Sequence, residues 1–101
     1  MVSFADRAET SPQVLVRFLD KESVLLNLET ERYYGLDETG TRMWQALTSA
    51  PNIEAAYQEL QDEFDVESEL LRLHLTELLA RLVDNGLLHI QPADVGTASA
   101  I

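Results

Sequence analysis

The chain has 101 residues, 46% hydrophobic and 25% charged, which fits one globular domain and is too apolar for intrinsic disorder. Its formal net charge of −11 argues against binding nucleic acid, because phosphate backbones attract basic proteins. The absence of cysteine excludes disulfides, cysteine-ligated zinc and thiol chemistry. No run approaches the ~20 apolar residues of a membrane span, and the first residues lack a secretory apolar segment. We therefore expect a soluble, cytoplasmic protein with no membrane partner.

The two ends of the chain differ in composition from its middle. Residues 1–12 are small, polar and charged, and Ser11-Pro12 favours a turn, which predicts a flexible N-terminal arm. The folded domain is expected over residues 13–90. A flexible C-terminal tail is expected over residues 91–101, which are mostly small and polar.

Three short segments with alternating apolar residues predict an antiparallel meander of three strands. The first segment runs from Gln13 to Leu19 and the third from Arg32 to Leu36. The second runs from Ser23 to Leu28, and the residues expected on its core face are Val24, Leu26 and Leu28.

The third segment, Arg32 to Leu36, is predicted to be an exposed edge of this sheet. Alternation places Tyr34 and Leu36 on one face and Tyr33 and Gly35 on the other. The missing side chain of Gly35 would let another backbone approach closely, although a bulge or a twist beside the next helix explains the glycine equally well. An open edge beside a helical groove is suited to the capture of an extended peptide.

Two helices are predicted directly after the strands. Asp37 is a suitable N-cap for the first, and Asn52 is a suitable N-cap for the second, which runs from Ile53 to Phe64. The apolar residues of the first helix recur at helical spacing, with a glycine in the same series: Gly40, Met43, Trp44 and Leu47.

The third predicted helix is the longest and runs from about Glu67 to Asn85. Asn85-Gly86 is a strong stop signal, because glycine adopts the left-handed conformation that ends many helices. Leu70 and Leu73 fall outside the apolar stripe of this helix, so it is more apolar than one core requires and is suited to lining a groove. The stripe itself consists of Leu71, Leu75, Leu78, Leu79 and Leu82.

Residues that could support catalysis form no recognisable constellation. His74 and Glu77 lie one helical turn apart, and such a pair is far more commonly a surface contact than a two-ligand metal site. No nucleophile elbow, phosphate loop or metal-ligand spacing occurs. We therefore predict no enzyme activity, no catalytic residues, no metal and no cofactor. The seven carboxylates from Glu54 to Leu70 indicate either a solvated face or a patch that attracts a basic partner.

The segment from Tyr33 to Trp44, YYGLDETGTRMW, together with the strands before it, resembles the PqqD-like family. The likeness continues through Phe64-Asp65-Val66 and the leucine-rich last helix to Asn85-Gly86-Leu87-Leu88, and it covers Val14 to Ile90. Members of this family are recognition elements for the precursors of ribosomally made, post-translationally modified peptides.

This resemblance implies an α+β fold of the winged helix-turn-helix kind, with a three-stranded antiparallel sheet packed on three helices. It also implies a protein that does not catalyse. Such a protein binds the leader segment of a precursor peptide by strand addition at the third strand and the third helix, and presents it to modifying enzymes. The contact residues expected in this sequence are Arg32, Tyr33, Tyr34, Gly35, Leu36, Leu70, Leu73, His74, Glu77 and Leu78.

The partners implied by the resemblance are a leader peptide and a leader peptidase, a cyclase or a radical SAM enzyme. The sequence looks most like the stand-alone elements of lasso-peptide pathways. Two other interpretations stay open: a winged-helix DNA-binding regulator, which the charge opposes, and a structural module that dimerises through its open edge. Both a monomer and a homodimer agree with the sequence.

Two positions depart from the family pattern. Many relatives carry glycine where Glu31 stands, and a positive φ there would cost the glutamate up to about 1 kcal/mol. Many carry asparagine where Asp37 stands, but aspartate caps a helix equally well. Neither departure removes the predicted binding edge.

Overall fold

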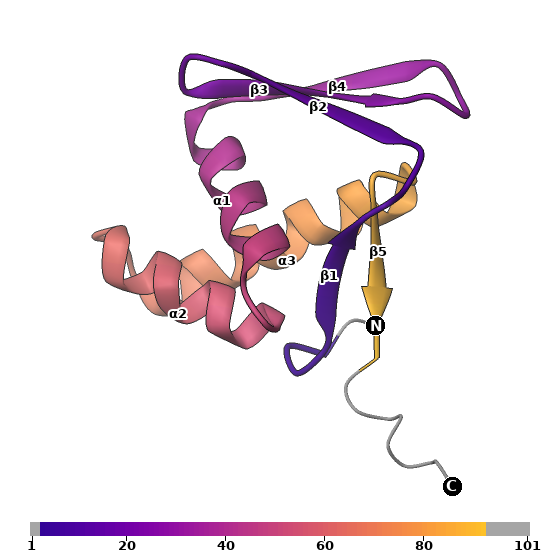
Figure 1. The fold of residues 1–101 in the computed structure, drawn as a ribbon. Helices are drawn as coiled ribbons and strands as arrows, with labels where there is room; N and C mark the ends of the chain where they lie inside the picture. The colour runs from indigo at the N-terminus through magenta and orange to yellow at the C-terminus, as the bar shows by residue number, and fades with distance from the viewer. Residues whose placement is uncertain (1–2, 93–101) are drawn as a thin grey trace, which may run out of the picture.

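A computed structural model describes residues 3–92 of the chain. A three-stranded sheet lies over the three helices, and a two-stranded sheet lies beside them (Figure 1). None of the helices in this part of the chain has both the length and the apolar composition to cross a bilayer. The elements are β1 (Arg7–Thr10), β2 (Val14–Leu19), β3 (Glu22–Asn27), β4 (Arg32–Leu36), α1 (Glu38–Ser49), α2 (Ile53–Glu63), α3 (Ser68–Asp84) and β5 (Leu88–Gln91).

The larger sheet is the predicted antiparallel meander, with the strand order β2-β3-β4. Its central strand places Leu25 opposite Val16 of β2 and Tyr34 of β4. Leu25 is fully buried on the side that faces the helices, whereas Val16 and Tyr34 are half-buried there. The α+β architecture of three strands on three helices is thereby confirmed.

The core face of β3 is the reverse of the one expected from the sequence. Val24 and Leu26 lie on the outer face of the sheet, and Leu28 is 52% exposed just beyond the strand. The buried positions on the inner face include two polar residues, Ser23 and Asn27. Both are hydrogen-bonded to other elements, so burial costs them little. The error arises because apolar residues occupy both faces of this strand.

The starts of α1 and α2 agree with the predicted caps. The side chain of Asp37 accepts a hydrogen bond from the N–H of Gly40 over 2.8 Å. The side chain of Asn52 accepts one from the N–H of Ala55 over 2.7 Å. Each cap satisfies one of the N–H groups that a helix start leaves without a partner.

The long helix α3 also has the predicted apolar stripe and the predicted end. Gly86 follows the helix with φ +70°, in the left-handed region that ends helices without strain only for glycine. Leu70 and Leu73 are exposed, as expected for residues outside the stripe. The residues of α3 buried in the core are Leu71, Leu75, Leu78, Leu79 and Leu82.

The structure corrects the expectation of a flexible arm over residues 1–12. Arg7–Thr10 forms β1, which pairs antiparallel with β5, and Ala8 is buried in the core. The partner strand lies about eighty residues further along the chain, so local sequence patterns gave no sign of it. Of the predicted C-terminal tail, Gln91 belongs to β5, and positions 93–101 lie outside the described residues.

The residues before β1 also complete the start of α2. The carbonyl of Asp6 accepts from the N–H of Ile53 over 2.8 Å, and that of Phe4 accepts from the N–H of Glu54 over 2.7 Å. The ring of Phe4 packs edge-on against Tyr57, with centroids 5.7 Å apart. The N-terminal segment therefore supplies acceptors for helix donors that would otherwise require water.

Candidate functional site

The outer edge of β4 presents the backbone groups of Tyr33 and Gly35. The N–H of Leu28 donates to the carbonyl of Gln13 over 2.8 Å, which fixes the alternation of bonded pairs between β2 and β3. Every second residue of β3, counted from Leu28, therefore bonds to β2, and the residues between them bond to β4. The β4 residues that bond to β3 are therefore Tyr34 and the residues two positions away on either side, Arg32 and Leu36. Tyr33 and Gly35, which lie between them, point their N–H and C=O groups away from the sheet.

The side chains of β4 alternate as predicted. Tyr33 is 72% exposed on the outer face, and Leu36 is buried on the helix side. Tyr34 is half-buried on that same side. A Cβ added to Gly35 would meet no atom within 4 Å, so the space beside this residue is open. Pairing with β3 is continuous through Gly35, which excludes the alternative of a bulge there.

A hollow of about 560 Å³ opens between β4 and the C-terminal end of α3. It lies on the helix side of the sheet, where the inward-facing side chains of β4 project. A strand added to the β4 edge would turn every second side chain toward this side. The residues lining the hollow are Asn27, Glu29, Thr30, Arg32, Tyr34, Asp84, Asn85, Gly86 and Leu87.

The structure brings together only part of the expected contact set. Arg32 and Tyr34 line the hollow, and the end of α3 forms its opposite side. The expected residues of α3 lie earlier in the helix, which runs from beside α2 to below the sheet (Figure 1). Of these residues, Leu78 is in the core. The other four are exposed: Leu70, Leu73, His74 and Glu77.

Sequence reasoning missed the residues that form the rest of the hollow. Asn27 is 3% exposed, and it stands between Leu26 and Leu28 in the sequence, which was the available signal. Asn85 and Gly86 were identified only as a helix stop, although a stop of this kind also exposes backbone carbonyls. Glu29 and Thr30 belong to the β3–β4 turn, and no sequence pattern placed that turn beside the end of α3.

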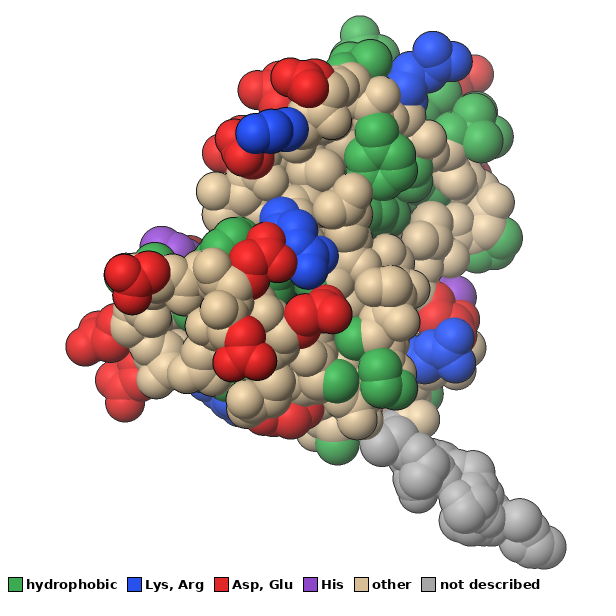
Figure 2. Space-filling model, turned by 60° about the vertical axis from the view of Figure 1, so that its left-hand side comes forward, with side chains coloured by type: hydrophobic (Ala, Val, Ile, Leu, Met, Phe, Trp, Pro, Cys, Tyr) green, Lys and Arg blue, Asp and Glu red, His purple; other side chains and the backbone are tan. Residues whose placement is uncertain are grey.

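The outer face of the three-stranded sheet is largely apolar. Leu15, Leu26 and Tyr33 lie side by side across the three strands, and Leu15 is 57% exposed. Among the outward-facing strand residues, only Arg17 and Glu22 are charged. Figure 2 shows hydrophobic side chains in the upper part of the view, over the sheet, and carboxylates both over the helices below and at the ends of the sheet. Exposed apolar surface of this kind commonly marks a site of protein contact.

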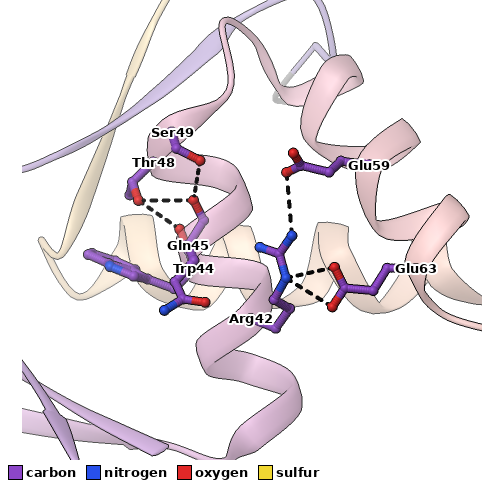
Figure 3. A network of polar contacts seen from close by, with 7 residues as sticks. All are labelled: Arg42, Trp44, Gln45, Thr48, Ser49, Glu59 and Glu63. Carbon is purple, nitrogen blue, oxygen red and sulfur yellow. Dashed lines mark hydrogen bonds and ion pairs between the residues drawn. The ribbon is translucent and has the colours of Figure 1, made fainter. Parts of the chain in front are cut away.

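The acidic segment of α2 and its surroundings is partly neutralised by arginines. The Nε atom of Arg42 on α1 lies 2.8 and 2.9 Å from the two carboxylate oxygens of Glu63, and its Nη2 atom lies 3.7 Å from Glu59 (Figure 3). Arg72 on α3 lies 3.9 Å from Glu54. These pairs favour a solvated and internally paired face over a patch reserved for a basic partner.

The two histidines belong to different surroundings. His74 is exposed on α3, whereas His89 lies 3.2 Å from Glu9 across the β1–β5 pair. Within residues 3–92, no group of three or more His, Cys, Asp or Glu side chains is arranged to hold a metal ion.

A three-stranded sheet with β4 as one free edge, above a layer of three helices, defines an α+β domain. The chain belongs to the PqqD family: the family model described as coenzyme PQQ synthesis protein D (PqqD) matches residues 22–88. A search of curated proteins found no match.

Solved structures share this fold over most of the chain. One is described as "TbiB1 in Complex with the TbiA(beta) Leader Peptide", with 31% identity, a TM-score of 0.75, and 80% of this chain and 94% of that chain covered. Another, "Lasso peptide synthetase B1 complexed with the leader peptide", has 24% identity and a TM-score of 0.74, and covers 82% and 98% of the two chains. The heterocyclase TruD matches at 18% identity with a TM-score of 0.60 over 89% of this chain, which spans 12% of that longer chain.

Proposed function

We propose that this protein binds the leader segment of a ribosomally synthesised precursor peptide as a strand added to the free edge of β4, and presents it to a modifying enzyme. The protein itself is non-catalytic in this role. The complex forms in the cytoplasm, where ribosomes release the precursor.

The observation that carries this proposal is the outward direction of the Tyr33 and Gly35 backbone groups beside an open hollow. Main-chain hydrogen bonds to such an edge give affinity with little dependence on sequence, and side chains that enter a groove give selectivity. The likeness to a structure described as a leader-peptide complex, at 31% identity, supports the same interpretation. The side chains proposed to contact the peptide include those of Arg32 and Tyr34, which line the hollow.

The decisive experiment removes one outward backbone donor. Tyr33→Pro deletes the N–H at the free edge, and Tyr33→Ala deletes the side chain but keeps the N–H. We expect fluorescence polarisation with a labelled leader peptide, taken from a precursor encoded beside this protein, to show binding that Tyr33→Pro abolishes. Tyr33→Ala should retain most of the affinity, because the main chain supplies the added strand with its hydrogen bonds.

Amide chemical shifts of the variants establish that they are folded and locate the peptide. Shift changes in the wild type should concentrate at Arg32–Leu36 and along α3. Unaltered binding by a folded Tyr33→Pro variant would rule out strand addition at β4. Equal loss in both variants would instead assign the affinity to the tyrosine ring.

The enzyme partner is proposed to contact the outer face of the sheet. That face is continuous with the peptide edge, because Tyr33 belongs to both, and it joins Tyr33 to Leu26 and Leu15 in one apolar row. The resemblance to the stand-alone elements of lasso-peptide pathways points to a leader peptidase or a cyclase as the enzyme. An apolar surface on that enzyme would bury the row without displacing a peptide at the edge.

The open edge also supports a second candidate function, in which β4 pairs with β4 of another copy. In that case β4 would not be free to bind added leader peptide. Sedimentation velocity at rising protein concentration, with and without peptide, separates the two. A dimer that persists with saturating peptide and binds none of it would favour the dimerisation module.

A further inference from the structure

Asn27 connects the two sides of the hollow through one buried side chain. Its Oδ1 accepts from the N–H of Glu29 over 2.9 Å and from that of Thr30 over 3.4 Å, which holds the β3–β4 turn. Its Nδ2 donates to the carbonyl of Asn85 over 3.1 Å and to that of Gly86 over 3.5 Å, which holds the end of α3. The same amide therefore contacts both elements that line the hollow.

Gly86 brings the second of these elements unusually close to Asn27. A Cβ added at Gly86 would lie 2.9 Å from the Nδ2 atom of Asn27, closer than such atoms normally approach. The glycine has φ +70°, so any other residue there would be strained as well. Gln13 adds a third bond, because its Nε2 donates to the carbonyl of Gly86 over 3.2 Å. The end of α3 is therefore held at a fixed distance from the sheet.

These contacts explain why a polar residue occupies a core position of β3. An apolar side chain at position 27 would leave the carbonyl of Asn85 and the N–H of Glu29 without their present partner. Buried amide groups are costly unless all of their hydrogen-bonding atoms are used, and both ends of this amide are used. The side chain is thus suited to setting the distance between the β3–β4 turn and the end of α3, and contact with a ligand is not its main role.

We propose that Asn27 is a positioning residue that fixes the width of the hollow beside Tyr34 and thereby selects the size of the peptide side chain that enters it. This inference rests on the proposed function, since it assigns selectivity to the same binding site. A strand added at β4 turns every second side chain toward the helix side of the sheet, where the hollow lies. A hollow of fixed width rejects a peptide side chain that is too large, whereas a hollow that can widen accepts it.

Two substitutions alter the spacing from opposite sides. Asn27→Asp keeps an oxygen for the turn N–H groups but sets a second oxygen against the carbonyls of Asn85 and Gly86, so the α3 side is released. Gly86→Ala pushes the Asn27 amide away from the other side. Ser23→Ala is the matched control, because Ser23 is also a buried polar residue of β3 but bonds to Thr41 of α1, away from the hollow.

The width is measured first, without peptide. The chain contains no cysteine, so Glu29→Cys and Asp84→Cys, both at exposed residues lining the hollow, introduce two spin labels without background. We expect the distribution of label distances to shift or broaden in Asn27→Asp and in Gly86→Ala, and to stay as in the wild type in Ser23→Ala. An unchanged distribution in both folded variants overturns the inference, whatever the peptide does.

Selectivity is measured second, with single Ala and Trp substitutions along the leader peptide. The wild type should bind the Ala peptide at least about tenfold more tightly than the Trp peptide at one inward position. That ratio should fall severalfold in Asn27→Asp and Gly86→Ala, but not in Ser23→Ala. An unchanged ratio, or an equal fall in all three variants, overturns the selective role. A wild type that binds no peptide overturns the proposed function, even where the label distances show that the spacing depends on Asn27.

Discussion

The hydroxyl oxygens of Ser23 on β3 and Thr41 on α1 lie 2.7 Å apart in the core of the protein. Both residues are buried, and the Oγ1 atom of Thr41 also lies 3.3 Å from the carbonyl oxygen of Leu36, to which it donates. Ser23 therefore donates to Thr41, and the chain of bonds ends on the last residue of β4. The pair therefore connects the start of α1 to β3 and to the last residue of β4.

Removing both members of this pair should cost less than the sum of the two single losses. Thr41→Val keeps the shape of the side chain but leaves the Ser23 hydroxyl buried without a partner, so the free energy of unfolding should fall by about 1–3 kcal/mol. The double variant Ser23→Ala, Thr41→Val should lose less than the sum of the two single losses. Chemical denaturation of the four proteins of this cycle gives the coupling directly. Strict additivity would show that the 2.7 Å contact contributes nothing of its own.

The same pair shows what could be predicted from the sequence and what could not. Helix positions and caps followed from local signals, because Asp37 and Asn52 act within three residues of their own position. The facing of β3 did not, because Ser23 and Asn27 are turned inward by partners eighteen and fifty-eight residues away. Apolar residues on both sides of that strand left the alternation ambiguous.

The candidate site was likewise predictable from the sequence only where it depends on local patterns. The segment Arg32–Leu36 was enough to predict that this strand is an exposed edge, and its alternation was enough to predict which side chains of β4 face outward. The opposite side of the hollow could not be predicted, because it depends on where α3 ends in space and not on its apolar stripe. The stripe identified the core of the helix, whereas Asp84–Leu87 after it lines the hollow.

Glu31 should be replaceable by glycine with a gain in stability. It closes the β3–β4 turn with φ +62°, in the left-handed region where a side chain is strained. We expect Glu31→Gly to raise the free energy of unfolding by up to about 1 kcal/mol, measured by denaturant titration. Glu31→Asn is the matched control and should give a smaller gain, because asparagine tolerates this region. A loss of stability in both variants would mean that the glutamate side chain stabilises the turn.

The segment before β1 should contribute to stability well beyond what a loose arm would. Deletion of residues 1–6 removes the Phe4 ring from Tyr57 and from Arg72, whose guanidinium carbon lies 3.9 Å from the ring centroid. It also removes the Phe4 and Asp6 carbonyls from the start of α2. Thermal and denaturant unfolding should show a loss of about 2–4 kcal/mol. Deletion of residues 1–2 is the control, and equal stability of both truncated proteins would contradict the role of Phe4.

A charge on the outer face of the sheet should separate peptide binding from peptide processing. Leu15 is 57% exposed, so Leu15→Glu should change the free energy of unfolding by no more than about 0.5 kcal/mol. Leu15 lies two strands away from the free edge of β4, so the affinity for leader peptide should also stay as in the wild type. Burial of the new carboxylate against an enzyme would be costly, so turnover of the precursor by the enzyme encoded beside this protein should fall about tenfold.

The control for that prediction is Gln58→Glu, which adds the same charge at an exposed position of α2 and should leave turnover unchanged. Turnover at limiting concentrations of this protein is the measurement, because an excess would mask weaker docking. Normal turnover with Leu15→Glu would remove the outer face as the enzyme contact. Loss of peptide affinity in the same variant would show that the edge and the outer face are not independent, and that the row from Leu15 through Leu26 to Tyr33 acts as one surface.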